Sequence, residues 1–293
     1  MEIWANATSP KATLLRRALR VMWIAILVYV LFVLAIMFCQ RRLLYFPTRL
    51  QPKVAEQIAA REGLTPWKNK GGQIIGWKLS ASTTANGAVL IVHGNGGCAL
   101  DRIYFAKPIH DAAPVDVYLL EYPGYGARVG SPSQKSFMAA AEEAIDLLTN
   151  RMPIYVVAES LGTGVAAHLA NVRSKQVSGL MLIAPYDSLV SVAQQKMPFF
   201  PVSLILWDRY DPATWLKSYR GPVGFVLAAA DQVIPEKFGR RLHDGYGGPK
   251  HLQIIPDAGH NDVADQSVEW WKNIFLFWQQ HGQTKEMKST DKP

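Results

Sequence analysis

The chain has 293 residues, of which 49% are hydrophobic and 18% charged, and its net charge is +8. This composition allows one large folded domain plus an appendage and argues against a mostly disordered chain. The whole positive excess lies in residues 1–70, which hold 11 Lys or Arg and 3 Asp or Glu. The other basic residues are scattered, without zinc-finger spacing or an aromatic-basic signature, so we expect no nucleic acid among the partners.

The front of the chain contains nineteen consecutive residues without a charge, Val21–Cys39. As a helix this run would span about 28 Å, close to the hydrocarbon thickness of a bilayer. It has no polar face, and it is too long for a signal peptide and lacks a small-residue cleavage site after it. We therefore predict a basic segment at 1–20 and an uncleaved transmembrane helix at 21–39. Arginines flank this helix, at Arg16, Arg17, Arg20, Arg41 and Arg42.

The orientation of this helix stays open. Within about fifteen residues of each end the number of basic residues is the same, so the positive-inside rule does not decide between the two orientations. The chain has two cysteines, Cys39 at the membrane edge and Cys98 in the globular part. An internal disulfide is therefore not expected.

From residue 71 onward, apolar strand patterns alternate with helix patterns. Repeated strand–helix–strand units build a doubly wound, mostly parallel sheet, whose ligand crevice lies at the carboxyl ends of the strands. We predict a linker at 40–70, an α/β domain at 71–282 and a polar tail at 283–293. The predicted strands are 73–79, 88–92, 115–120, 154–159, 180–184, 223–228 and 252–255, with helices at 100–110, at 136–150 and after residue 160.

The alternation breaks between Asp187 and Lys217, where an apolar insertion has no matching strand pair. Loops of this length in compact domains are usually lids or binding segments. We predict a cap over the active site at about 187–217. An ordinary connecting helix packed on the sheet is the alternative.

Ser160 stands where the strand pattern 154–159 meets a helix pattern. This is the arrangement of a nucleophile elbow, a strained turn with positive φ that tolerates only small side chains two positions on either side of the serine. Ala158 and Gly162 occupy these positions. Glycine is the commoner residue at both, so Ala158 is a mild departure from the pattern.

A serine nucleophile needs a histidine base and a carboxylate that orients the histidine. Asp231 follows the predicted strand 223–228, and His260 follows 252–255. The order Ser160, Asp231, His260, each just past a strand, is the order of an α/β-hydrolase triad. We predict these three as the catalytic residues, with Asp187, just past 180–184, as the alternative acid.

Other features of the sequence argue against cofactor chemistry. There is no His-Glu-x-x-His, no cysteine pair and no Gly-Lys-Ser/Thr after the glycine-rich loop 94–97. We therefore expect no metal, nucleotide or other cofactor. His93 is expected to shape its loop, because His260 already fills the role of the base.

Over roughly residues 70–282 the chain resembles the α/β-hydrolase superfamily. The resemblance rests on the elbow, Asp231, Gly259-His260, and the motifs His93-Gly94-Asn95-Gly96-Gly97 and Tyr122-Pro123-Gly124-Tyr125-Gly126. It implies an oxyanion hole formed by the backbone N–H groups of Asn95 and Leu161. The segments 41–47 and 130–133 are similar to those of membrane-anchored α/β-hydrolase-domain proteins. With an uncleaved anchor, this implies a single-pass membrane protein whose catalytic domain is extracytoplasmic.

These observations predict a membrane-anchored serine hydrolase that acts on a carboxylic ester or thioester through an acyl-enzyme. A site under an apolar cap and held at a membrane favours a lipid or acyl substrate. The fold does not determine the substrate. Two alternatives stay open: a serine peptidase with the same triad, and a catalytically silent membrane scaffold or binding protein.

Overall fold

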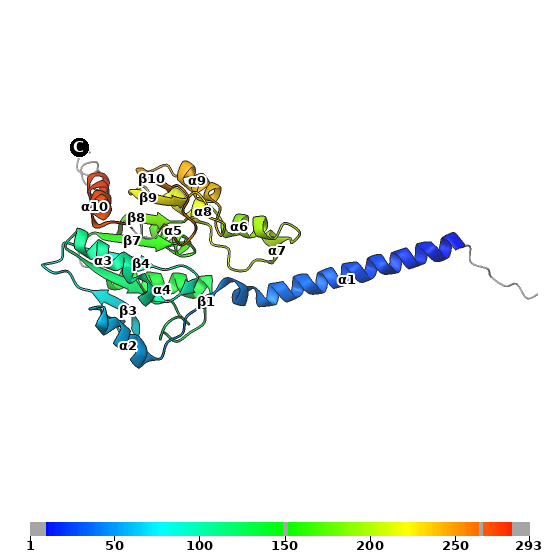
Figure 1. Ribbon diagram of the computed structural model, residues 1–293, viewed down its shortest axis with the longest axis horizontal. Coiled ribbons are helices and arrows are strands. Elements are labelled where there is room, and N and C mark those ends of the chain that lie inside the picture. The colour runs from blue at the N-terminus through cyan, green and yellow to red at the C-terminus, as the bar shows by residue number, and fades with distance from the viewer. Residues whose placement is uncertain (1–9, 149–151, 264–265, 283–293) are drawn as a thin grey trace, which may run out of the picture. The chain divides into compact units, whose positions relative to one another are not determined.

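The computed structural model describes residues 10–148, 152–263 and 266–282 (Figure 1). The chain divides into two compact units, the first ending at Leu43 and the second beginning at Leu44. The predicted tail at 283–293 and the first nine residues of the predicted basic segment lie outside the described residues.

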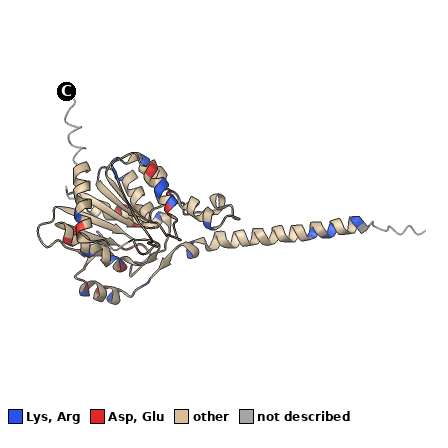
Figure 2. Ribbon diagram, turned by 45° about the horizontal axis from the view of Figure 1, so that its top comes forward, with Lys and Arg blue, Asp and Glu red and all other residues tan. Residues whose placement is uncertain are grey.

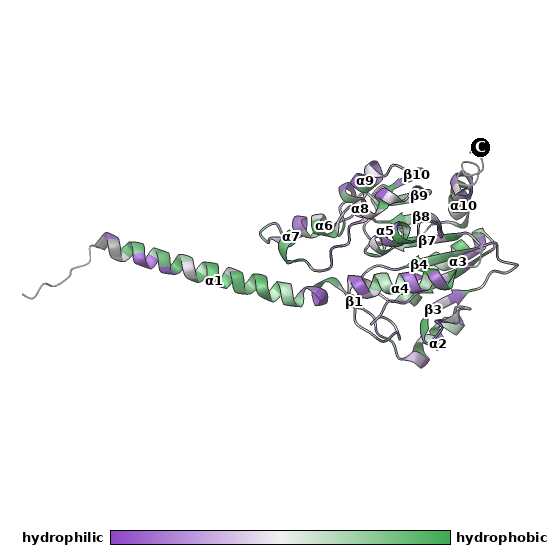
Figure 3. Ribbon diagram, turned by 180° about the vertical axis from the view of Figure 1, so that it is seen from behind, coloured by the Kyte–Doolittle hydropathy of each residue, from purple (hydrophilic) through white to green (hydrophobic). Residues whose placement is uncertain are grey.

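The first unit consists, in its described part, of helix α1 (Pro10–Leu44) without its last residue. Within α1, the 32 residues Thr13–Leu44 are long and apolar enough to cross a membrane, and an 18-residue stretch of them has a mean hydropathy of 2.9. Lys and Arg lie toward its two ends (Figure 2), and hydrophobic residues fill the stretch between them (Figure 3). Among the described residues α1 is the one candidate membrane span, and it contains the predicted segment 21–39.

The second unit is built on an eight-stranded sheet in the order β10-β9-β8-β7-β4-β6-β3-β2. The six strands β10, β9, β8, β7, β4 and β6 are parallel to their neighbours among these six, whereas β3 pairs antiparallel with both β2 and β6. This confirms the predicted mostly parallel sheet. The strands are β2 (Thr65–Lys68), β3 (Ile74–Leu79), β4 (Gly87–Val92), β6 (Val115–Leu120), β7 (Ile154–Glu159), β8 (Val177–Ile183), β9 (Val223–Ala228) and β10 (Lys250–Ile255).

Helices cover both faces of this sheet and enclose two hydrophobic cores (Figure 1). Successive side chains of a strand point to opposite faces, so in β4 Leu90 belongs to one core and Ile91 to the other. A strand apolar on both faces is what this position requires. The first core takes side chains from α4 (Gln134–Leu147), α5 (Gly162–Val172) and α9 (Glu236–Gly245), and the second from α3 (Ile103–Ala112) and α10 (Val268–Gly282).

The segment predicted as a linker, 40–70, differs from that expectation. From Leu44 onward it belongs to the second unit, where it forms β1 (Phe46–Pro47), α2 (Pro52–Arg61) and β2. The physical reason is burial of the apolar side chains that are spaced along it. The folded domain therefore begins at Leu44 rather than at residue 71. The buried side chains are those of Tyr45, Ala55, Ala59, Leu64 and Trp67.

The insertion between β8 and β9 is helical. It contains α6 (Leu189–Lys196), α7 (Val202–Ile205), α8 (Pro212–Trp215) and the short 3-10 helix η2 (Leu216–Ser218). Two backbone bonds join its two ends to each other, from the N–H of Leu189 to the carbonyl of Tyr210 and from the N–H of Ala213 to that of Asp187. Its function as a cap stays a prediction.

Candidate active site

Ser160 occupies the sharp turn between β7 and α5. Its φ is +51°, in the left-handed region that residues with a side chain rarely adopt. Its N–H donates to the carbonyl of Ile183 at 2.8 Å, which ties the turn to the end of β8. The strained elbow predicted from the sequence is therefore present.

Close packing explains the small residue two positions after the serine. A Cβ on Gly162 would lie 2.5 Å from the carbonyl oxygens of both Val92 and His93. These are backbone atoms at the end of β4 and cannot give way as a flexible side chain could. Glycine at this position lets α5 begin directly against the neighbouring strand.

His260 lies between Ser160 and Asp231. Its Nε2 is 2.9 Å from Ser160 Oγ, and its Nδ1 is 2.6 Å from Asp231 Oδ2. The second carboxylate oxygen of Asp231 accepts the backbone N–H groups of Val233 and Ile234, both at 2.8 Å. With Nδ1–H directed at the carboxylate, Nε2 is free to accept the serine proton, as in a Ser-His-Asp triad.

The topology brings these three side chains together. Ser160 follows β7, Asp231 follows β9 and His260 follows β10, so all three lie beyond the carboxyl ends of parallel strands. These ends meet at one edge of the sheet, the usual place of a site in an open α/β fold.

Asp187, the alternative acid, has other partners. It follows β8 at the same edge, but its Oδ2 accepts from Nε of Arg241 at 2.7 Å. Its Oδ1 accepts from the N–H of Ser188 at 2.8 Å. The structure therefore places Asp231 beside the histidine and pairs Asp187 with an arginine.

A cavity of about 230 Å³ opens beside the serine. Asn95, one of the two predicted oxyanion donors, lines this cavity together with Ser160 and His260. Leu161, the other, directly follows the serine as the N-cap residue of α5, and its side chain is buried. The N–H groups at a helix start have no partner within the helix and carry partial positive charge, which suits a developing oxyanion. The remaining lining residues are Gly94, Gly96, Gly97, Arg102, Glu159 and Asn261.

His93 is buried and acts on its own loop, as expected. Its Nδ1 lies 2.8 Å from the carbonyl oxygen of Gly94. The same peptide group carries the N–H of Asn95, so this hydrogen bond fixes the direction of a predicted oxyanion donor. The ring packs against the rings of Tyr122 and Tyr125, at centroid distances of 4.3 and 5.2 Å.

A buried ion pair beside the serine was not predicted from the sequence. Arg102, at the end of the short helix η1 (Ala99–Arg102), donates from Nε to Glu159 Oε2 at 2.9 Å and from Nη2 to the Gly96 carbonyl at 3.1 Å. Burial lowers the pKa of Arg102, but Glu159, together with Tyr104 and Asp101, raises this pKa, and the net shift is upward. A signal was available, since a glutamate inside an apolar strand requires a counter-charge.

Within the described residues, no group of three or more His, Cys, Asp or Glu side chains could hold a metal ion. The expected absence of a cofactor stays a prediction.

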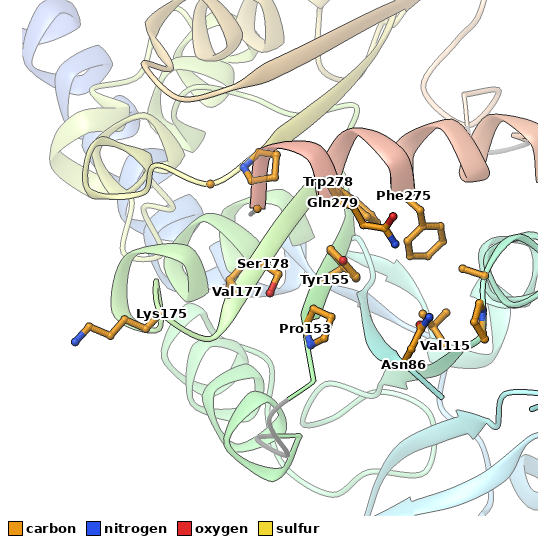
Figure 4. Close-up of a pocket in the computed structure, with 15 residues that line it drawn as sticks. Asn86, Val115, Pro153, Tyr155, Lys175, Val177, Ser178, Phe275, Trp278 and Gln279 are labelled. Carbon is orange, nitrogen blue, oxygen red and sulfur yellow. The ribbon is translucent and has the colours of Figure 1, made fainter. Parts of the chain in front are cut away.

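A larger cavity, of about 730 Å³, lies at the other edge of the sheet (Figure 4). Val115 and Val177, at the starts of β6 and β8, line it together with Trp278 of α10. The triad follows the opposite ends of the strands, and none of its members lines this cavity. The smaller cavity is therefore the one that serves the candidate site.

Comparison with known proteins gives the following matches. Residues 87–205 match the family model described as the alpha/beta hydrolase fold. An uncharacterized protein of Mycobacterium tuberculosis is 31% identical over 253 residues, which cover 84% of this chain and 89% of that protein. The lysophosphatidylserine lipase ABHD12 of Macaca fascicularis is 27% identical over 202 residues, 60% of this chain and 50% of that protein.

Solved structures show the same fold. Est1E of Butyrivibrio proteoclasticus, in a structure with bound ferulic acid, is similar with a TM-score of 0.59 at 14% identity, over 70% of this chain and 95% of that one. A putative lipase of Acinetobacter baumannii is similar with a TM-score of 0.60 at 15% identity, over 80% and 96% of the two chains.

Proposed function

The chain belongs to the α/β-hydrolase family, and from this premise we propose that it is a membrane-anchored serine hydrolase of carboxylic esters or thioesters. The observation that carries the proposal is the position of His260, within hydrogen-bond distance of both Ser160 Oγ and Asp231 Oδ2. A base that reaches the serine and is oriented by a buried carboxylate is the arrangement that activates a serine.

In the proposed reaction, Ser160 Oγ attacks the acyl carbonyl carbon while His260 Nε2 takes the serine proton. General base action of this kind contributes about 10²- to 10⁴-fold to the rate. The N–H groups of Asn95 and Leu161 hold the tetrahedral oxyanion, and losing one such donor costs about 10²- to 10³-fold. His260 then gives its proton to the leaving alcohol or thiol. Water, activated by the same histidine, releases the acid from the acyl-enzyme.

Two features support a lipid or acyl substrate. One relative of this chain is named a lysophosphatidylserine lipase. The insertion 187–217, which we propose as a cap, exposes large apolar side chains, with Phe199 and Leu204 exposed by 85% and 79%. An apolar surface of this kind suits an acyl chain better than a small polar ester.

We further propose that α1 anchors the protein in a membrane and that the catalytic domain is extracytoplasmic. The support for anchoring is the length and hydropathy of Thr13–Leu44. A carboxy-terminal fusion to alkaline phosphatase, which is active only outside the cytoplasm, tests the orientation. An active fusion supports the proposal. An inactive phosphatase fusion, together with a fluorescent fusion of the same chain to a fluorescent protein, would contradict it.

The substrate class is tested with the detergent-solubilised full chain. Matched esters, thioesters and anilides of increasing acyl length are offered to the wild type and to Ser160→Ala. Ester or thioester cleavage by the wild type alone supports the proposal. Cleavage confined to the anilides identifies the peptidase alternative, and no turnover of any substrate by the folded wild type favours a binding protein.

A further inference from the structure

The last residue of the candidate membrane helix and the four residues after it run beside the glycine-rich loop of the site. We call residues 44–48 the juxtamembrane segment and residues 94–97 the oxyanion loop. Strand β1 of this segment pairs in parallel with β5 (Gly96–Gly97) of the loop. The two are far apart in the sequence, so the contact is a property of the fold rather than of local chain geometry.

The hydrogen bonds between them converge on Asn95. Its side-chain Nδ2 donates to the carbonyl of Leu44, the last residue of α1, at 2.7 Å. Its backbone carbonyl accepts the N–H of Phe46 at 2.9 Å. One more bond secures the loop, from the N–H of Thr48 to the Gly97 carbonyl at 2.8 Å.

This support matters because the loop is rich in glycine. It contains three glycines, and Gly97 adopts a φ of +83°. Glycine-rich backbone samples many conformations, whereas an oxyanion donor stabilises a transition state only when it is already held in place. The juxtamembrane segment engages the side chain and the carbonyl of Asn95, which leaves the N–H of this residue to serve the cavity that Asn95 lines.

Tyr45 attaches the same segment to the insertion. Its ring is buried, and its hydroxyl donates to Asp208 Oδ2 at 2.9 Å and lies 3.2 Å from the hydroxyl of Tyr210. Burial, with the Asp208 carboxylate adding to it, raises the pKa of Tyr45, so the hydroxyl keeps its proton and remains a donor. One short segment therefore joins the oxyanion loop to the proposed cap.

We propose that the juxtamembrane segment is a positioning element of the active site, which holds the N–H of Asn95 for the oxyanion. This inference rests on the proposed function. It assigns a part in catalysis to the residues with which the catalytic domain begins.

The test uses the full chain in detergent and a matched pair of variants at one position. Phe46→Pro removes the N–H that donates to Asn95, and Phe46→Ala keeps it. The Phe46 side chain is 56% exposed, so its loss alone is a mild change. We expect Phe46→Pro to lower kcat about 10- to 100-fold with KM within about twofold, since only the transition state uses the donor. Phe46→Ala should retain the wild-type kcat.

A second readout separates positioning from general loosening of the fold. A phenylboronic acid forms a tetrahedral adduct with an active serine, and its inhibition constant should weaken in Phe46→Pro by about the same factor as kcat. Folded Phe46→Pro with wild-type kcat and boronate affinity would overturn the inference.

If Phe46→Pro unfolds below the assay temperature, the variant Asn95→Ala tests the inference instead. It removes the side-chain bond to Leu44 and keeps the backbone N–H of residue 95. The same fall in kcat and boronate affinity supports the inference, and wild-type values overturn it. Wild-type protein that neither turns over an ester nor binds the boronate would instead refute the proposed function itself.

Discussion

The imidazole Nδ1 of His260 lies 2.6 Å from Oδ2 of Asp231, although 29 residues separate them in the chain. This contact distinguishes between the two acids that the sequence offers. An amide in place of the acid keeps the shape but no longer stabilises the imidazolium or selects the tautomer.

We therefore expect Asp231→Asn to lower kcat/KM about 10²- to 10⁴-fold. Asp187→Asn serves as the control and should change kcat/KM by less than about tenfold, because Asp187 is bound to Arg241. Steady-state kinetics with one ester substrate measures both. A larger fall in kcat/KM for Asp187→Asn than for Asp231→Asn would identify Asp187 as the acid of the triad.

The closeness of β4 to the elbow predicts the effect of one added methyl group. Gly162→Ala places a Cβ 2.5 Å from two backbone carbonyl oxygens, so β4 and α5 must move apart. We expect the free energy of unfolding to fall by about 1–3 kcal/mol, together with slower reaction of Ser160. Gly247→Ala is the control, since a Cβ there meets no atom within 4 Å. Equal stability of the two variants would contradict this account of the elbow.

The buried Arg102–Glu159 pair predicts a large stability effect. Arg102→Met leaves a carboxylate that is 10% exposed without its guanidinium partner, and we expect a loss of about 3–5 kcal/mol in denaturant unfolding. The double variant Arg102→Met/Glu159→Gln no longer carries the unpaired buried carboxylate and should recover part of this loss of stability.

The matched control is Lys107→Met, which breaks the exposed pair of Lys107 and Glu62. Exposed pairs contribute about 0–1 kcal/mol. Similar losses of unfolding free energy from Arg102→Met and Lys107→Met would show that the buried pair stabilises the fold no more than the exposed pair does.

Cys98 predicts a pH-dependent reactivity. Burial, followed by the carboxylates of Glu121 and Asp101, raises the pKa of its thiol to about 12, against about 8.5 in an unfolded chain. Only the thiolate reacts, so in a Cys39→Ser variant we expect slow modification of native protein by a disulfide reagent at pH 8 and fast modification in denaturant.

The same shift sets the sign of a stability effect. Above about pH 8.5 the unfolded chain loses a thiol proton that the folded chain keeps, so this group makes stability fall as pH rises toward 12. Equally fast modification of native and unfolded protein at pH 8 would contradict the burial of Cys98.

Most of the sheet could be predicted from short apolar runs. The strands predicted at 115–120 and 223–228 coincide with β6 and β9, because strands buried on both faces leave little room for polar residues. β8 begins earlier than predicted, at Val177, because Ser178 and Gly179 interrupt its apolar pattern. Helix α10 was not predicted, although Trp271, Ile274 and Trp278 show the helical spacing of a buried face.

The candidate site was predictable to the extent that topology determines it. Residues that directly follow parallel strands meet at one edge of the sheet, so Ser160, Asp231 and His260 could be grouped from their positions alone. The pairing of Arg102 with Glu159 depends on where η1 packs, and the contact of the juxtamembrane segment with Asn95 depends on how the chain enters the domain. The sequence signals that Glu159 needs a counter-charge but does not identify Arg102 as its source, and it carries no local signature of the contact with Asn95.

The most direct test of the central claim is labelling of the detergent-solubilised full chain with a fluorophosphonate probe. The account predicts that the wild type is labelled, whereas Ser160→Ala and His260→Ala, with unchanged circular dichroism spectra, are not. A folded wild type that takes up no label, or a Ser160→Ala variant labelled as strongly as the wild type, would contradict an activated serine at this site.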